Sequence, residues 1–298
     1  MNELYITSLH TYPVKSCAGV ELSTAEITPR GLIHDRDFML VDDTGNYLSQ
    51  RQIPQMALVV PRIGETAITL SSPGVEEIEV PLEIEQDDER LIQANVHGKP
   101  VYGQVVSDDL NEWFNTALPA YKDNEGFKLV RVREDLPRYI YGSYHGLDTS
   151  NQVGFADGYA ILLTSEASLE RLNGEMDEPV PMDRFRPNIV VGGEDLEPYD
   201  EDYWIGIDIG QLAAQVVKGC DRCQIPDVNQ ATAQVGKAVR VALKTRRGKN
   251  RYDKNNGGVF FGQNLNHVYV PGVSVSVGDP VIVYDRAEKP NIIFPSTI

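Results

Sequence analysis

The chain has 298 residues, of which 41% are hydrophobic, enough for a sizeable core in one large or two medium domains. Its net charge of -17 argues against nonspecific binding to nucleic acid or to an anionic membrane. No run reaches the roughly 18 apolar residues of a membrane span, the N-terminus lacks the pattern of a secretory signal, and three cysteines cannot form a disulfide framework, so we expect a cytoplasmic protein.

Short strand-like segments dominate the chain, and turn residues separate them. The predicted strands are residues 4–10, 20–28, 38–41, 57–63, 101–106, 127–132, 188–191, 204–209, 212–217 and 281–284, with a hairpin turn at 43–46. Two segments have helical periodicity, residues 108–118 and residues 165–173, the second after a Thr164-Ser165 cap. Many short strands with few helices predict an α+β fold that is mostly β and contains a barrel.

Two of the three cysteines lie close together, in the segment Lys218-Gly219-Cys220-Asp221-Arg222-Cys223 that follows a predicted strand. Neighbouring cations favour the thiolate form of a cysteine. A thiolate is a suitable ligand for a soft metal and a suitable centre for sulfur chemistry. The turn that carries the two cysteines is therefore the first candidate site.

Several interpretations of this pair remain open at this point. A zinc site needs about four ligands, and only Cys17 and five scattered histidines could complete it. A thioredoxin-like redox pair would open a helix, for which the following residues, 224–227, are poorly suited. In a third interpretation one cysteine is a metal or sulfur ligand and the other its structural neighbour. In the fourth, the two thiols only pack together.

Cationic side chains recur beside predicted turns and strand ends. Examples are Lys15, Arg36, Arg51, Arg184 and Arg186. Each alone has the pattern of an ordinary surface ion pair, yet arginine is also the usual residue for planar recognition of phosphate or carboxylate. Several such positions together with a thiolate fit a phosphorylated cofactor whose metal is held by sulfur.

A basic segment, residues 237–254, stands out in this acidic chain. Its cations are Lys237, Arg240, Lys244, Arg246, Arg247, Lys249, Arg251 and Lys254, and its single acid is Asp253. The segment is either a solvated strand and loop, or an electropositive surface for an anionic cofactor group or an acidic protein partner.

Seven segments, in order along the chain, resemble the MOSC family, the domain found at the C-terminus of molybdenum cofactor sulfurases. They are YPVKSC (12–17), GLIHDRDFMLVD (31–42), FADGYAILLTSEASLERLN (155–173), FRPNIV (185–190), CDRC (220–223), FGQNL (261–265) and VGDP (277–280). The resemblance is closest to the subgroup of the mitochondrial amidoxime-reducing component and bacterial YcbX-like proteins. It implies a MOSC N-terminal β-barrel-like domain at residues 1–120 and a MOSC β-barrel domain at residues 121–298, with a few short helices.

The resemblance also implies a molybdenum cofactor, with molybdenum carried by molybdopterin. In the family the second cysteine of the CxRC turn ligates molybdenum, which makes Cys223 the implied metal ligand and catalytic residue. The implied cofactor-binding residues are Lys15, Ser16, Arg36, Thr164, Ser165, Arg186, Asn188, Asp221 and Arg222. Close relatives usually have serine or threonine where this chain has Asp221, whose carboxylate would repel an anionic cofactor unless Arg222 or Lys218 neutralises it.

The activity implied by the resemblance is the reduction of N-hydroxylated compounds, such as hydroxylaminopurines, amidoximes and hydroxylamines. YcbX-like relatives continue into an iron–sulfur domain whose cysteines this chain lacks. We therefore expect electrons from a separate protein, a ferredoxin, flavodoxin or reductase, that docks on residues 237–254. The alternative is a molybdenum cofactor carrier or a relay of sulfur as a cysteine persulfide. Cofactor sulfurases carry a MOSC domain beside a pyridoxal-phosphate domain, so the family is also associated with pyridoxal phosphate binding.

Overall fold

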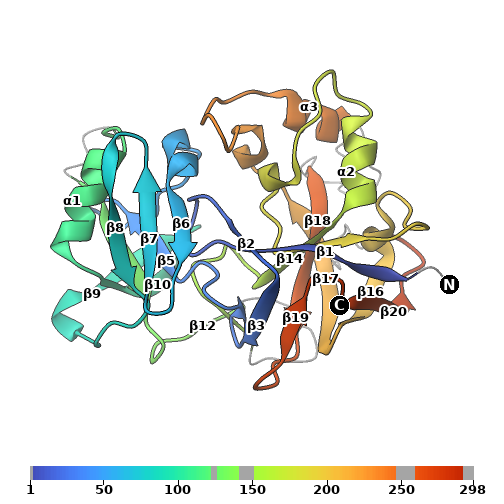
Figure 1. Ribbon diagram of the computed structural model, residues 1–298, viewed down its shortest axis with the longest axis horizontal. Helices are drawn as coiled ribbons and strands as arrows, with labels where there is room; N and C mark the ends of the chain where they lie inside the picture. The colour runs from blue at the N-terminus through green and yellow to red at the C-terminus, as the bar shows by residue number, and fades with distance from the viewer. Residues whose placement is uncertain (1–2, 122–125, 141–150, 246–258, 291–298) are drawn as a thin grey trace.

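The computed structural model describes residues 3–121, 126–140, 151–245 and 259–290. Two β-rich lobes lie side by side in it (Figure 1). The strands of the barrel lobe, on the right of the figure, are β1 (Leu4–Thr11), β2 (Val20–Leu22), β14 (Ile161–Ser165), β15 (Ile189–Gly192), β16 (Trp204–Ile209), β17 (Leu212–Asp221), β18 (Phe260–His267) and β20 (Pro280–Arg286). These strands form an eight-stranded sheet in the order β15-β14-β18-β17-β16-β20-β1-β2, and β1 also pairs with β15. That extra pairing closes the sheet into a barrel.

The barrel has a continuous apolar interior. Ile6, Leu163, Trp204, Ile207 and Leu265, from four different strands, are all fully buried there. The alternation of side chains along each strand produces this core, because every second residue points inward. The predicted α+β, mostly β fold is confirmed.

The second lobe consists of two smaller sheets and one helix. Its four-stranded sheet has the order β5 (Phe38–Val41), β11 (Lys128–Val132), β10 (Lys99–Val105) and β9 (Leu91–Val96), and its three-stranded sheet the order β6 (Val60–Ile63), β7 (Ala67–Ser72) and β8 (Val75–Pro81). Helix α1 (Asp108–Ala117) begins at the N-cap Ser107, whose hydroxyl accepts a hydrogen bond from the Leu110 N–H at 3.2 Å. It buries Leu110, Trp113 and Phe114 in the core of this lobe.

The remaining elements connect and cover the two lobes. They are β3 (Thr24–Thr28), β4 (Gly31–Leu32), β12 (Arg138–Tyr139), β13 (Gln152–Val153), β19 (Ser274–Ser276), α2 (Glu166–Asn173), α3 (Ala238–Leu243), and the 3₁₀ turns η1 (Pro54–Leu58), η2 (Asp88–Arg90), η3 (Met182–Arg184), η4 (Asp200–Tyr203) and η5 (Ile225–Asp227). Leu172 of α2 and Leu243 of α3 share an apolar cluster with the stacked rings of Phe185 and Phe261. No helix in the described ranges has the length and apolar character needed to cross a membrane.

The two hydrophobic cores do not follow chain order. Ile6, Ile27 and Leu32, near the N-terminus, pack with the barrel, whereas Leu129 of β11 packs in the other lobe. The first strands of the chain therefore contribute to the same lobe as residues 153–281. The predicted boundary between two domains at residue 120 stays a prediction.

Two predicted strands differ from the structure, and one predicted turn is confirmed. Residues 20–28 divide at Ser23 into β2, which pairs with β1, and β3, which pairs with β4 and β19. Residues 57–63 begin inside η1, because Pro54 at its first position has a dihedral angle suited to a helical turn. At the predicted turn, the Asp42 carboxylate accepts hydrogen bonds from the N–H groups of Thr44 (3.0 Å) and Asn46 (2.8 Å).

Gly262 in β18 is a position where a side chain cannot fit. Its φ is +77°, and an added Cβ would lie 2.7 Å from the carbonyl oxygen of Leu163 and 2.7 Å from Thr164 Cγ2. We expect Gly262→Ala to lower the free energy of unfolding by about 2–3 kcal/mol, from backbone strain and overlap with a neighbouring strand. Gly272→Ala is the matched control, since Gly272 has φ +81° but no atom near its added Cβ. Equal losses in urea unfolding of the two variants would contradict the steric explanation.

Candidate functional site

A cavity of about 140 Å³ lies where the cysteine turn meets loops from other parts of the chain. The predicted site residues that line it are Lys15, Ser16, Arg36, Arg186, Asn188, Asp221, Arg222 and Cys223. Closure of the barrel explains why they meet. Because β1 pairs with β15, the loop after β1 and the segment before β15 leave the barrel together, and the His10 N–H donates to the Asn188 carbonyl at 2.8 Å. Strand β17 ends at the cysteine turn beside β18.

Three lining residues have an unusual backbone conformation. Ser16, Arg36 and Arg186 have φ values of 70°, 53° and 54°, in the left-handed region that non-glycine residues rarely occupy. Each such residue costs roughly 1–3 kcal/mol and persists where the surrounding structure enforces it, which is common at functional sites. Strained backbone positions and charged side chains therefore occur together at this cavity.

A buried polar network fixes the orientation of Arg36. Its Nη1 donates to both oxygens of Asp35, at 2.6 and 2.5 Å, and to Asn188 Oδ1 at 3.2 Å. Asp35 Oδ1 also accepts from the Tyr12 N–H at 3.0 Å and from Asn188 Nδ2 at 2.9 Å. Asp35 is 3% exposed and Asn188 is 1% exposed. Asp35, which the sequence analysis did not single out, is thus the residue that positions two predicted cofactor contacts.

The ring of Tyr12 connects two of the cations. The guanidinium carbons of Arg36 and Arg186 lie 4.3 and 4.2 Å from its centroid, in the range of a cation–π interaction. Burial lowers the pKa of Arg186 to about 10, so that it remains a cation at neutral pH. Its Nη2 is buried and has no hydrogen-bond partner among the described residues. A buried cationic donor without an acceptor favours binding of an anionic group.

The cysteine turn distinguishes its two thiols. Arg222 donates from Nη1 to Cys220 Sγ at 3.1 Å and from Nη2 to the Phe185 carbonyl at 2.6 Å. Cys223 is exposed, and its sulfur accepts the Ile225 N–H at 3.5 Å. The Asp221 carboxylate accepts the backbone N–H of Val259 at 3.2 Å, whereas Arg222 binds Cys220. Cys223 is therefore the more accessible sulfur, and a backbone amide, rather than Arg222, binds the carboxylate of Asp221.

Lys15 is buried at the cavity wall. It donates to the Phe155 carbonyl at 2.8 Å and forms an ion pair with Asp157, whose carboxylate also lies 3.1 Å from His97 Nε2. Burial lowers the pKa of the Lys15 ammonium, and Asp157 opposes this shift. Asp157, Gly158 and Tyr159 line the cavity too. These three residues were not among the predicted site residues, although the FADGY segment that contains them belongs to the family resemblance.

Thr164 and Ser165 do not line the cavity. Both are fully buried, Thr164 against the Met182 sulfur at 3.3 Å, and Ser165 as the N-cap of α2, where its Oγ accepts the Ser168 N–H. The Ser165 hydroxyl also donates to Glu201 at 2.9 Å. The expected cap is confirmed. Since neither residue lines the cavity, their predicted contact with a cofactor stays a prediction.

The buried Glu201 beside this cap makes stability depend on pH. Burial, followed by the neighbouring charge of Asp202, raises the pKa of Glu201 to about 7. Because the folded-state pKa is raised, the stabilisation is fully present below pH 4.5 and is lost as pH rises through about 7, up to about 3 kcal/mol. We expect Glu201→Gln to remove this loss, measured as unfolding midpoints between pH 5 and 8. Glu170→Gln, on the exposed side of α2, is the control, and parallel pH profiles for wild type and Glu201→Gln would contradict the assignment.

The side chains at the cavity fit a metal that is bound mainly by an organic cofactor and receives one further ligand from the protein. Lys15, Arg36, Arg186 and Arg222 supply positive charge for an anionic cofactor, and Arg222 Nε, like Arg186 Nη2, is buried without a partner among described residues. Cys223 supplies one accessible sulfur. In the described ranges no group of three or more His, Cys, Asp or Glu side chains could hold a metal ion by itself. The residues therefore fit the molybdopterin cofactor that the sequence resemblance implies.

Only the first part of the basic segment 237–254 is described. Its α3 packs against η5, which directly follows the cysteine turn, and Arg240 forms an ion pair with the buried Asp227. Lys237 and Lys244 are exposed. Five of the predicted docking residues lie outside the described residues: Arg246, Arg247, Lys249, Arg251 and Lys254.

Comparison with known proteins identifies two family matches in this chain. The MOSC N-terminal beta barrel domain matches residues 3–120, and the MOSC domain matches residues 150–282. Mitochondrial amidoxime reducing component 2 of Bos taurus is 29% identical over 93% of this chain and 82% of its own length. Component 1 of Mus musculus is 31% identical over 76% of this chain and 66% of its own. A molybdenum cofactor sulfurase of Oryza sativa subsp. japonica is 29% identical over 90% of this chain and 33% of its own length.

Proposed function

Since the chain belongs to the MOSC family, with an N-terminal and a C-terminal MOSC region, we propose that it is a molybdenum-cofactor-dependent reductase of N-hydroxylated compounds. The observation that carries the proposal is the convergence of four cations, Lys15, Arg36, Arg186 and Arg222, on a cavity with the exposed Cys223 at its edge. Similarity to amidoxime-reducing components over most of the chain supports the substrate class.

We assign roles to the lining residues on this basis. Cys223 is the proposed thiolate ligand of molybdenum, a soft donor suited to it. The proposed contacts of the pterin and its phosphate are Lys15, Ser16, Arg36, Arg186, Asn188, Asp221 and Arg222. Arginine suits this role because its planar fork binds phosphate oxygens in pairs. The Asp221 carboxylate is oriented by the Val259 N–H, which reduces its repulsion of an anionic group.

The reaction needs two electrons and two protons for each substrate. The N–O bond of R–NHOH breaks, and the products are R–NH₂ and water. When bound, the cofactor supplies the two-electron redox chemistry. The chain's own residues bind the anionic parts of the cofactor, hold it in a partly enclosed cavity and leave the Cys223 side open to substrate.

We further propose that electrons come from a separate protein, a ferredoxin, flavodoxin or reductase, that docks on residues 237–254. The support is the packing of α3 against η5, beside the cysteine turn, together with the exposed Lys237 and Lys244. Such partners are commonly acidic, and a basic patch on an acidic chain selects for them. The cytoplasmic location and the association with pyridoxal phosphate stay predictions.

The test is turnover with a small artificial electron donor. Protein from a host that makes molybdenum cofactor is mixed with reduced methyl viologen and either benzamidoxime or hydroxylamine. We expect the dye to be oxidised in proportion to the amidine or ammonia formed, and protein from a cofactor-deficient host to be inactive. Absence of turnover in protein that contains stoichiometric molybdenum would overturn the reductase proposal.

A carrier or sulfur-relay role is the second candidate. The exposed sulfur of Cys223 and the similarity to a molybdenum cofactor sulfurase favour it. A relay transfers labelled sulfur from a Cys223 persulfide to an acceptor, and a carrier transfers the intact cofactor to an apoenzyme. Either transfer from protein that reduces neither substrate would favour this second function over the first.

A further inference from the structure

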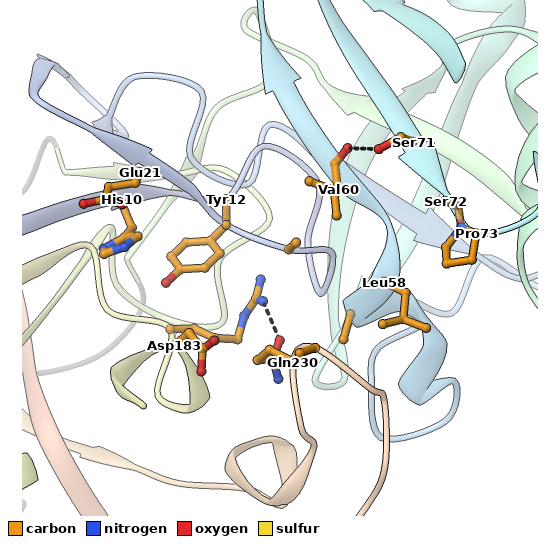
Figure 2. A pocket seen from close by; sticks show the side chains of 15 residues that line it. His10, Tyr12, Glu21, Leu58, Val60, Ser71, Ser72, Pro73, Asp183 and Gln230 are labelled. Atoms are coloured by element: carbon orange, nitrogen blue, oxygen red, sulfur yellow. Dashed lines mark hydrogen bonds between the residues drawn. The ribbon is translucent and has the colours of Figure 1, made fainter. Parts of the chain in front are cut away.

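A second cavity, larger than the one at Cys223, lies between the two lobes. It has a volume of about 670 Å³, within the range of small-molecule binding sites. Figure 2 shows Leu58, Val60 and Pro73 on one side of it, and His10, Tyr12 and Asp183 on the opposite side. We call it the interlobe groove.

The interlobe groove adjoins the cofactor cavity through one side chain. Arg186 lines both cavities and is 7% exposed. The chain after the cysteine turn also borders both, because Ile225 lines the cofactor cavity and Gln230 lines the groove. Gln230 is held by paired amide hydrogen bonds with Gln50 at 2.9 Å. A ligand in the groove would therefore lie beside the cavity that holds the proposed reaction centre.

The two walls of the interlobe groove differ in chemistry. Leu58, Val60 and Pro73 give one wall an apolar surface. The other wall carries the carboxylates of Glu21 and Asp183, neither of which forms an ion pair with a described residue. His10 lies between them, and its burial lowers the pKa of the imidazole, which favours the neutral form at neutral pH. Arg186 also lines the groove, but the residue is 7% exposed and its guanidinium lies over the Tyr12 ring, so the two carboxylates outweigh this one cation. The groove thus favours a ligand with an apolar body and without negative charge.

We propose that the interlobe groove binds the ring-bearing part of the substrate and selects aryl N-hydroxylated compounds, neutral or cationic, over small or anionic ones. The inference rests on the proposed function, which puts the N–O bond at the Cys223 cavity. The ring would pack on Val60 and Leu58, because burial of apolar surface is favourable. The carboxylates of Asp183 and Glu21 would repel anionic substituents on the ring-bearing part and attract cationic ones.

Binding to cofactor-free protein tests the groove without any turnover. The probe is benzamidine, with acetamidine as the cation that lacks a ring and benzoate as the ring with negative charge. We expect calorimetry to give at least tenfold tighter binding of benzamidine than of either comparison ligand. Ser72→Trp, which fills the groove, should weaken benzamidine binding at least tenfold, and Asp183→Asn should weaken it several-fold. Thr66→Trp, an exposed position outside the lining, is the matched control.

Turnover separates this inference from the proposed function. In molybdenum-loaded protein, Ser72→Trp should lower kcat/KM for benzamidoxime at least tenfold and leave kcat/KM for hydroxylamine unchanged, because hydroxylamine has no ring to place. Absence of benzamidine binding, or equal binding in wild type and Ser72→Trp, would overturn the groove assignment. A loaded wild type that reduces neither substrate would overturn the reductase function, while the benzamidine measurement would still decide the groove.

Discussion

Cys223→Ser is expected to lose at least nine-tenths of its molybdenum while keeping the fold of the wild type. Cys223 is exposed, and its sulfur accepts one weak hydrogen bond from the Ile225 N–H, so the fold depends little on it. A serine hydroxyl is a harder donor than a thiolate and binds a soft metal poorly. Metal content by mass spectrometry and the unfolding midpoint, measured on the same preparation, check the two halves of this expectation.

Cys220→Ser is the matched control for that experiment. The Cys220 sulfur accepts Arg222 Nη1 at 3.1 Å, and a serine oxygen can accept the same donor. We therefore expect molybdenum content near that of the wild type, with at most a modest loss of stability. If Cys220→Ser loses the metal and Cys223→Ser retains it, the assignment within the pair is wrong, and the guanidinium-bound sulfur is the ligand.

The sequence predicted strands where apolar residues alternate or cluster, as in the continuous run Phe38–Val41. The predicted positions of β1, β5, β15, β16 and β20 agree with the structure to within one or two residues. In β18 the pattern fails because polar residues point into the protein: Gln263 is fully buried and donates to Asp202 at 2.6 Å. A polar residue in a buried strand needs a partner from elsewhere in the chain. That partner becomes visible only in the folded protein.

At the candidate site, too, residues in local sequence motifs were predicted, whereas residues that act through tertiary contacts were not. The family resemblance identified the cations that line the cavity, and Cys223 with them. It did not single out Asp35 or Asp157, because an acid that orients a cation looks like any other acid in sequence. Thr164 and Ser165 mark the start of α2 correctly, but Glu201 and Ser168 use the Ser165 hydroxyl, so it is not available to a ligand in the cavity.

Asp35→Ala is expected to be the most destabilising single change among the residues that surround the cavity. It leaves Arg36, whose side chain is only 14% exposed, without its charge partner, and it removes the acceptor for the Tyr12 N–H and Asn188 Nδ2. Breaking a buried ion pair from one side typically costs about 3–5 kcal/mol. Urea unfolding of cofactor-free protein measures this loss directly. We also expect the variant to retain little molybdenum, because Arg36 and Asn188 lose their fixed orientation.

A double variant distinguishes an uncompensated charge from a simple loss of packing. Asp35→Leu with Arg36→Met removes both partners, so no isolated buried cation remains, and it should be less destabilised than Asp35→Ala although it changes one residue more. Molybdenum retention should be low in both variants, because both lack an oriented Arg36. If the double variant is the less stable of the two, the network holds the fold through its hydrogen bonds rather than through compensation of charge. In that case the Tyr12 N–H and Asn188 are the groups that depend on Asp35 most.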